Sequence, residues 1–245
     1  MISSIFNTVL YEPFYNALIF LTGVLPGADV GFAVIALTIC VRFILLPLTH
    51  KQLHTQRRMK LVEGEMGAIK KKYESDKQEQ TRQIMELYKK HGINPFSGFL
   101  LIFIQIPVLL ALYFVFTRGI PFTAEHLYSF VTLPISVNLN FLGLVDLSAK
   151  NYILAILVGL SQYFQIKLSM PPSPPRVAGT NPSFSEELTR SMGTNMRYVM
   201  PVMIAVISAG FPSVVALYWL VSNLFGIAHE LVVKRKATQI IAKPA

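Results

Sequence analysis

The chain has 245 residues, of which 53% are hydrophobic and only 14% are charged. This balance, with a positive mean hydropathy, is typical of a polytopic membrane protein and excludes an ordinary soluble domain. The single cysteine, Cys40, excludes an intramolecular disulfide. The net charge of +9 would suggest nucleic-acid binding in a soluble chain, so its distribution along the sequence decides its meaning.

Residues 1–22 are predicted to form an amphipathic helix that lies on the outer membrane surface. Their apolar residues recur at spacings near three and four, apart from a break at Pro13. No lysine or arginine precedes Arg42, so the segment lacks the basic region of a signal peptide. A short additional span is the alternative interpretation of this segment.

The next segment, 31–49, is long and apolar enough to cross a bilayer, yet it contains one charge, Arg42. Its residues reach ~28 Å as a helix, close to the thickness of the hydrocarbon core. Arg42 lies roughly 10 Å inside the end marked by Thr49. An arginine at that depth is unfavourable unless water or protein surrounds it, so Arg42 is a candidate functional residue.

A polar segment, 50–94, follows and carries 11 lysines and arginines, which place it outside the bilayer. Apolar residues at helical spacing on both sides of Glu74-Ser75-Asp76 predict two amphipathic helices joined by a polar turn. Because the apolar stripe is thin, we expect a cytoplasmic helical hairpin that moves relative to the membrane part.

Four further apolar stretches complete the prediction of an all-α membrane protein with five spans. Pro212 separates the last two stretches, which must therefore form a tight hairpin. Clustered prolines in 170–182 cannot continue a helix and predict an irregular loop. The predicted segments are spans at 97–117, 151–168, 195–211 and 213–233, an external loop at 118–150, a cytoplasmic loop at 169–194 and a basic tail at 234–245.

Lysines and arginines are distributed unequally between the two sides of this predicted bundle. The hairpin carries 11, the stretch from Lys167 to Arg197 carries 4 and the tail from Lys234 carries 4, so 19 of the 22 lie on one side. The other side has only Arg118 and Lys150. By the positive-inside rule the basic side is cytoplasmic, so the N-terminus is outside and the C-terminus inside. A basic cytoplasmic face can bind anionic lipid headgroups and equally a ribosome surface. It explains the net charge without direct nucleic-acid binding.

Polar side chains from four predicted spans fall at a similar depth in the cytoplasmic half. Gln105 lies roughly 12 Å, Gln162 roughly 9 Å and Asn223 roughly 15 Å from the cytoplasmic ends of their helices, near the depth of Arg42. These groups cannot all face lipid without a large free-energy cost. We expect them to converge on a hydrated groove that is open to the cytoplasm and closed toward the outside. The same half also contains Ser161, Gln165 and Ser222.

Two purely structural interpretations stay open beside the groove. Arg42 can extend its long side chain toward the inner headgroups, as basic residues near a membrane surface do. The glutamines and Asn223 can instead serve as hydrogen-bonding contacts between helices.

Catalytic and cofactor-binding motifs are not evident. His229-Glu230 begins like a zinc-binding helix, but Val233 stands where the second histidine of H-E-x-x-H belongs. Nucleophile-elbow, P-loop and dinucleotide-binding patterns are missing, and there is no cysteine pair for a metal. We therefore expect no enzyme, no cofactor and no metal site.

Several motifs, specific in combination, cover nearly the whole chain. They are Asn94-Pro95 followed by Gly98, IQIPVLLALY from Ile104, Val41-Arg42 before Leu45-Leu46-Pro47-Leu48, YFQIKLSMP in the third span, and LYWLVSNLFGIAHE from Leu217 after Phe211-Pro212. In these motifs the chain resembles the YidC family of membrane protein insertases, which has mitochondrial and chloroplast relatives. That family has five spans, an outside N-terminus and a cytoplasmic hairpin. Without a large domain before Gly31, the chain resembles its short form.

The resemblance implies roles for individual residues. Arg42 would be the cation of the groove, and Gln165 and Trp219 would line the same groove. Tyr218 and Asn223 lie in the matching motif of the fifth span. Departures from residues that the family often has are Leu101, Phe99 and Val62-Glu63.

The function that follows is that of an insertase and chaperone in a bacterial plasma or inner membrane. Arg42 would attract acidic groups of a nascent chain's hydrophilic tail, and the apolar segment would then enter lipid. The expected partners are nascent membrane proteins with acidic or short hydrophilic tails, the ribosome, the Sec translocon and anionic lipids. The alternatives are a small secondary transporter or channel with Arg42 as an anion site, and a structural assembly scaffold.

Overall fold

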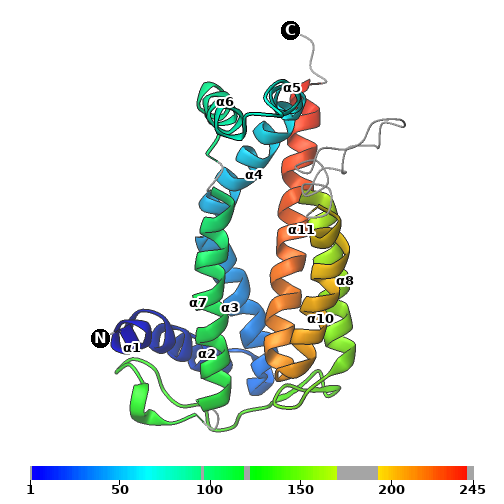
Figure 1. The fold of residues 1–245 in the computed structure, drawn as a ribbon. Helices are drawn as coiled ribbons and strands as arrows, with labels where there is room; N and C mark the ends of the chain where they lie inside the picture. The colour runs from blue at the N-terminus through cyan, green and yellow to red at the C-terminus, as the bar shows by residue number, and fades with distance from the viewer. Residues whose placement is uncertain (1, 95–96, 119–121, 170–192, 242–245) are drawn as a thin grey trace.

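The computed structural model describes residues 2–94, 97–118, 122–169 and 193–241, and within these ranges the side chains of 2–3, 56–57, 97–105, 118 and 236–241 are not described. Figure 1 shows a mostly helical molecule in which long helices run between two ends. A helical hairpin caps one end, and an N-terminal helix with irregular loops covers the other.

The N-terminal segment is a continuous helical run built from α1 (Ile2–Phe6), a π-helical turn (Asn7–Tyr11) and α2 (Glu12–Val24). It lies across the end of the long helices (Figure 1), where its inner face packs against α3 and α7. Asn16 links it to the following loop: its Nδ2 donates to the His126 carbonyl at 2.8 Å, and its Oδ1 accepts from the Tyr128 N–H at 2.7 Å.

The stretch predicted as one span from 31 to 49 is two helices. α3 (Val30–Ile44) begins at Asp29, whose side chain accepts from the Gly31 N–H at 2.7 Å. α4 (Leu46–Leu61) follows after a bend of 58°. Pro47 accounts for the break, because it has no N–H to bond the preceding turn and its ring fits only the first turn of a new helix.

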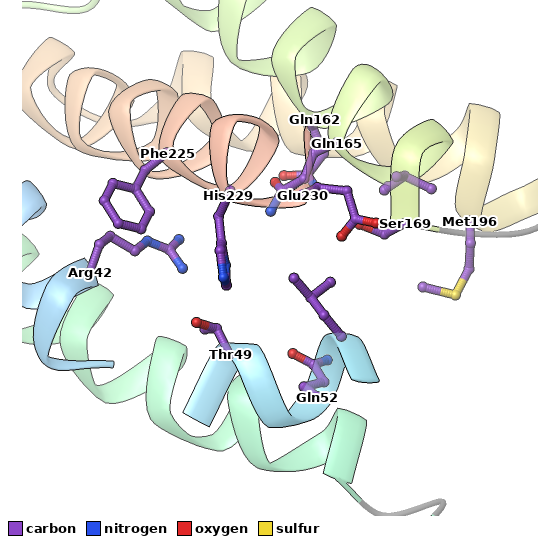
Figure 2. Close-up of a pocket in the computed structure, with 13 residues that line it drawn as sticks. Arg42, Thr49, Gln52, Gln162, Gln165, Ser169, Met196, Phe225, His229 and Glu230 are labelled. Atoms are coloured by element: carbon purple, nitrogen blue, oxygen red, sulfur yellow. The ribbon is translucent and has the colours of Figure 1, made fainter. Parts of the chain in front are cut away.

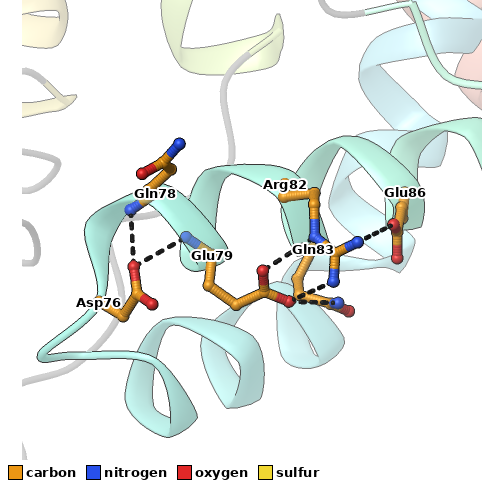
Figure 3. Close-up of polar contacts among 6 residues, drawn as sticks. All are labelled: Asp76, Gln78, Glu79, Arg82, Gln83 and Glu86. Atoms are coloured by element: carbon orange, nitrogen blue, oxygen red, sulfur yellow. Dashed lines mark hydrogen bonds and ion pairs between the residues drawn. The ribbon is translucent and has the colours of Figure 1, made fainter.

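The hairpin consists of α5 (Glu63–Lys72) and α6 (Lys77–Lys90). Asp76 caps α6 by accepting from the N–H groups of Gln78 and Glu79 at 3.1 and 3.0 Å (Figure 3). Further along the same helix, Arg82 binds Glu79 through two hydrogen bonds and approaches Glu86 at 3.7 Å. The bonds from Arg82 hold the pKa of the Glu79 carboxyl below its usual value. The apolar core between the hairpin helices is small, with Val62, Leu87 and Ile93 buried.

The remaining long helices are α7 (Ser97–Arg118), α8 (Tyr152–Ser169), α10 (Met200–Gly210) and α11 (Ser213–Ile241). A π-helical turn, Asn195–Val199, precedes α10. α8 packs against both α10 and α11, and α11 also contacts α3 and α7. Phe211 is extended and Pro212 follows it, so α10 and α11 form the tight hairpin that the sequence predicts.

In the described part of the chain, two helices are long and apolar enough to cross a membrane, Tyr152–Ser169 and Ser213–Arg235. A third candidate is the bent pair of α3 and α4. The apolar stretch Ile106–Thr117 of α7 is shorter, and α10 has 11 residues. These lengths agree with a helical membrane protein and give two or three candidate spans.

The loop from 122 to 150 closes one end of the helices. It contains a short turn of 3-10 helix, Ala124–His126, and two antiparallel strands, β1 (Asn140–Phe141) and β2 (Val145–Asp146). Phe141 lies against the backbone of Gly31, where a side chain larger than hydrogen would collide with its ring. Beneath this loop is the main apolar core, whose buried residues include Tyr15, Leu18, Val30, Val34, Leu112, Val115, Leu147, Val214 and Leu217.

Candidate functional site

A cavity of about 240 Å³ lies in the half of the molecule away from this core. Figure 2 shows its lining side chains, which come from α3, α4, α8, α11 and the turn before α10. We call it the Arg42 cavity. It is lined by Arg42, Thr49, Gln52, Leu53, Gln162, Gln165, Ile166, Ser169, Met196, Phe225, Gly226, His229 and Glu230.

Arg42 projects into the cavity from the last turn of α3. Its guanidinium extends past Phe225 toward His229 (Figure 2), and the residue is half-buried. Within the described ranges, no hydrogen bond or ion pair joins Arg42 to another residue. The acidic residue of the cavity, Glu230, lies 3.9 Å from the Lys234 ammonium instead. The guanidinium is therefore a cation with unused donors in a concave site, which suits an incoming carboxylate.

Two predicted residues of α8, Gln162 and Gln165, share the cavity with Arg42. α11 approaches Gln165 closely because residue 226 is glycine: a Cβ there would lie 2.5 Å from Gln165 Nε2. At the end of α8, the Lys234 ammonium donates to the Leu168 carbonyl at 2.6 Å. α8 and α11 thus form one wall of the cavity with neutral amides on its surface.

Asn223 does not reach the Arg42 cavity. It is 2% exposed, and its Nδ2 donates to Ser161 Oγ at 3.0 Å and lies 3.5 Å from the Val158 carbonyl. Ser161 in turn donates to the same carbonyl at 2.8 Å. Among the described contacts, Asn223 therefore links α11 to α8 inside the wall.

The predicted residues Tyr218 and Trp219 lie nearer the apolar end of α11. Tyr218 is buried in the main core, while Trp219 packs beside the cluster formed by Leu154, Val158 and Ala216. Neither lines the Arg42 cavity, but Tyr218 lies close enough to Arg42 to interact with it electrostatically. The side chain of Gln105, in α7, lies outside the described side chains.

Several cavity residues were not predicted from the sequence. Thr49 and Gln52 lie on one face of α4, and Phe225 and His229 lie one turn apart on α11. This three- and four-residue spacing predicts a shared helix face. It does not identify the cavity, because a single straight span over 31–49 does not include the 58° bend between α3 and α4.

The chemistry of the cavity is that of a binding site. It combines one guanidinium, three amides, one imidazole, one carboxylate, two hydroxyls and several apolar side chains, and it opens to the surface. The described residues contain no cluster of histidine, cysteine or acidic side chains suited to a metal ion. The arrangement can hold a polypeptide segment that has both acidic and apolar groups.

Comparison with known proteins shows the family of this chain. The model of the family described as 60Kd inner membrane protein matches residues 20–240. Membrane protein insertase MisCA of Bacillus subtilis is 34% identical over 216 residues, covering 86% of this chain and 72% of that protein. Membrane protein insertase YidC of Fusobacterium nucleatum is 34% identical over 206 residues, covering 84% of this chain and 86% of that protein.

Longer relatives match over the same region. Membrane protein insertase YidC of Haemophilus influenzae is 30% identical over 226 residues, which cover 91% of this chain but 36% of that protein. The motifs around Arg42, Gln165 and Trp219 lie within the matched region. The chain therefore belongs to the 60Kd inner membrane protein family, together with the bacterial proteins named YidC membrane protein insertases.

Proposed function

We propose that this protein is an insertase of a bacterial inner membrane, which integrates nascent membrane proteins and assists their folding. Family membership and the names of its relatives support the insertase role. The observation that carries the mechanism is the half-buried Arg42 guanidinium in a cavity that polar and apolar side chains line together.

In this mechanism the cavity shortens the hydrocarbon layer that a client's hydrophilic tail must cross. Each charge of a client tail is unfavourable in hydrocarbon by several kcal/mol. A water-accessible cavity that reaches partway into the bilayer shortens the hydrocarbon path. Arg42 attracts the client's carboxylates there, while Gln162 and Gln165 offer hydrogen bonds to its backbone.

Release follows from the client's own hydrophobicity. Its apolar segment gains roughly 25 cal/mol for each Å² of apolar surface that leaves water, and it can move along α8 and α11 into lipid. No nucleotide is needed for this step. We assign Asn223, Tyr218 and Trp219 to the wall that supports this path, and Gln105 to the opposite side of the groove.

The proposed topology has five spans, with the N-terminus outside and the C-terminus in the cytoplasm. The bias of 19 out of 22 lysines and arginines toward one side supports it. So does the position of the α5–α6 hairpin at the end opposite the 122–150 loop (Figure 1). In this arrangement the N-terminal helix lies on the outer surface, and the basic hairpin and tail contact anionic lipids, the ribosome and the Sec translocon.

Reconstituted protein tests the mechanism directly. The client is a single-span test protein whose translocated tail carries two aspartates, paired with the same client carrying asparagines. We expect Arg42→Ala to reduce insertion of the acidic client about tenfold, which corresponds to ~1.4 kcal/mol, and to affect the neutral client less. Arg42→Glu reduces it further, whereas Arg42→Lys retains part of the activity because the charge is kept but the planar donor fork is lost.

Two results would contradict the mechanism. Normal insertion of the acidic client by Arg42→Ala would exclude attraction by this cation. Arg42-dependent flux of small anions through liposomes without any client would favour the transporter or channel instead.

A further inference from the structure

A second cavity, of about 640 Å³, lies between the end of α2 and the 122–150 loop. We call it the α2–loop pocket. The last turns of α2 and the following turn of 3-10 helix, Pro26–Ala28, form one side, and residues 130–136 of the loop form the other. The lining residues are all uncharged. They are Phe20, Gly23, Val24, Leu25, Gly27, Ala28, Phe130, Thr132, Leu133, Pro134, Ile135 and Ser136.

Both rims of the pocket expose large apolar side chains. On α2, Phe20 is 53% and Val24 is 66% exposed, while on the loop Phe130 is 76% and Ile135 is fully exposed. The opposite face of α2 packs into the main core through Leu18, so this helix carries apolar side chains on two faces. Neighbouring exposed apolar side chains from two elements mark a surface that contacts lipid or another protein.

The loop is anchored near these exposed side chains. Val131 is buried in the main core. Further along the loop, the Asn138 N–H donates to the Ala28 carbonyl at 2.9 Å, and the Asn138 carbonyl accepts from the Val30 N–H at 3.0 Å. The apolar side chains therefore project from a segment that the fold holds in place.

The same hydrogen bonds set the level of the pocket relative to the bilayer. Val30 is the first residue of α3, where the chain enters the bilayer in the proposed topology. Ile135 precedes Asn138 by three residues, so it lies within roughly 10 Å of this entry point. The headgroup layer on each side of the hydrocarbon core is about 5–8 Å thick. The pocket therefore lies at the level where headgroups and acyl chains meet.

The distribution of charge favours a hydrocarbon ligand. The sequence has no charged residue in 13–28 or in 127–139. The carboxylate that follows the first of these stretches, Asp29, accepts from the N–H groups of Gly31 and Leu142 at 2.7 and 3.3 Å. An acidic client tail would need a cation here, and a polar protein surface would need complementary charges. An uncharged pocket with apolar rims suits an acyl chain instead.

We propose that the α2–loop pocket binds acyl chains of outer-leaflet phospholipid, and that Phe130, Leu133 and Ile135 enter this leaflet together with Phe20 and Val24. The inference goes beyond the insertase function, because it depends on where α3 enters the bilayer and not on Arg42 or a client. The bound lipid holds the loop that closes this end of the helices at the membrane surface.

Tryptophan fluorescence tests the proposal, because Trp219 is the sole tryptophan of the chain. In a Trp219→Phe background, Phe20→Trp and Ile135→Trp each place one reporter on a rim of the pocket. The purified full-length variants are reconstituted into phospholipid vesicles with or without bromine on the acyl chains, and acrylamide is the aqueous quencher. We expect brominated lipid to reduce the fluorescence of both reporters at least twofold and acrylamide to reduce it little.

Two reference reporters calibrate these values. Val206→Trp lies on the exposed apolar side of α10 and should respond to brominated lipid. Ser75→Trp lies in the turn of the polar hairpin and should respond to acrylamide.

A second substitution tests whether the two rims share one lipid. Ile135→Ser, combined with the Phe20→Trp reporter, should weaken quenching by brominated lipid about twofold, because the acyl chain loses one side of its site. The Ile135 side chain is fully exposed, so this change should leave folding intact. The matched control is Val9→Ser, which removes an exposed apolar side chain of the same N-terminal helical run outside the pocket. It should leave the quenching unchanged.

Three outcomes would overturn the proposal. Quenching of the Ile135→Trp reporter by acrylamide and not by brominated lipid would place the loop in water. Protection of both reporters from both quenchers would show that a second copy of the chain covers the pocket. Unchanged quenching of the Phe20→Trp reporter by brominated lipid after Ile135→Ser would show that α2 alone contacts the membrane.

Discussion

Arg42 and Asn223 represent two ways of placing a polar side chain among apolar helices. Asn223 is satisfied inside the protein, with Ser161 Oγ at 3.0 Å and the Val158 carbonyl nearby. Arg42 faces a cavity and has no such partner among the described residues. Their depths in the sequence are similar, so depth alone does not separate a packing residue from one available to a ligand.

The Asn223 contact is expected to contribute modestly to stability. Asn223→Ala should lower the free energy of unfolding by about 0.5–1 kcal/mol, the usual range for a hydrogen bond between helices in a membrane protein. Thermal unfolding in detergent measures the change. Ser161→Ala and the double variant complete the cycle, and strictly additive effects would show that the two side chains are not coupled.

Gly226 controls the position of Gln165. A methyl group at residue 226 would meet Gln165 Nε2 at 2.5 Å, and this amide is the movable end of a flexible side chain. Gly226→Ala should therefore change stability by less than ~1 kcal/mol but reduce crosslinking between residue 165 and a bound client. Gly67→Ala, on the hairpin where a Cβ meets nothing within 4 Å, is the control. Unchanged crosslinking from residue 165 would contradict the prediction.

At the level of elements, local rules account for where helices begin and end. Pro47 ends α3 and starts α4 at a bend of 58°, and Asp76 starts α6. The bend turns α4 so that Thr49 and Gln52 line the Arg42 cavity. The α5–α6 hairpin has only a small core, so its stability depends more on caps and ion pairs than that of the long helices.

The cap of α6 should be measurable in isolation from the rest of the protein. Asp76→Ala removes two hydrogen bonds to backbone N–H groups and should destabilise the helix start by about 1 kcal/mol. Hydrogen exchange of the amides at 78 and 79 should accelerate about fivefold. Glu74→Ala, in the same turn, should leave these amides unchanged, and equal acceleration in both variants would exclude a capping effect.

At Gly159 the contact between α8 and α10 leaves no room for a larger side chain. At Gly226 the contact between α8 and α11 can accommodate one, because a flexible side chain faces it. At Gly159 a Cβ would lie 2.9 Å from Ala205 Cβ and 3.1 Å from the Pro201 carbonyl, so the helices themselves must separate. Gly159→Ala should therefore destabilise the protein by about 1–3 kcal/mol. A melting temperature equal to that of Gly226→Ala would contradict this difference.

The two ends of the molecule differ in packing, because one holds the main apolar core and the other holds the Arg42 cavity. α2, α3, α7, α11 and the 122–150 loop bury a continuous apolar core at one end, while the Arg42 cavity is lined by α3, α4, α8, α11 and the turn before α10. This asymmetry fits a site that is reached from one side only. It does not favour a pore through the centre of the bundle.

The orientation of these ends in the membrane can be tested by labelling. In a Cys40→Ser background, Ser75→Cys lies in the hairpin turn and Ser148→Cys lies in the opposite loop. A membrane-impermeant maleimide added to intact cells should modify residue 148 and not residue 75, because the basic side stays in the cytoplasm. Inverted vesicles should give the reverse pattern, and labelling of both residues from one side would overturn the topology.

The sequence by itself determined the helical membrane class, the tight turn at Pro212, and the choice of Arg42, Gln162 and Gln165 as candidates. These follow from hydropathy, proline chemistry and charge, which are properties of local segments. Only the tertiary structure decided that these three side chains line one cavity while Asn223 and Tyr218 are buried in its surroundings. The bend at Pro47 and the close approach at Gly226 set those positions, and they also bring His50 to His229. Such meetings depend on how helices distant in the chain pack together, which helical spacing within one segment does not specify.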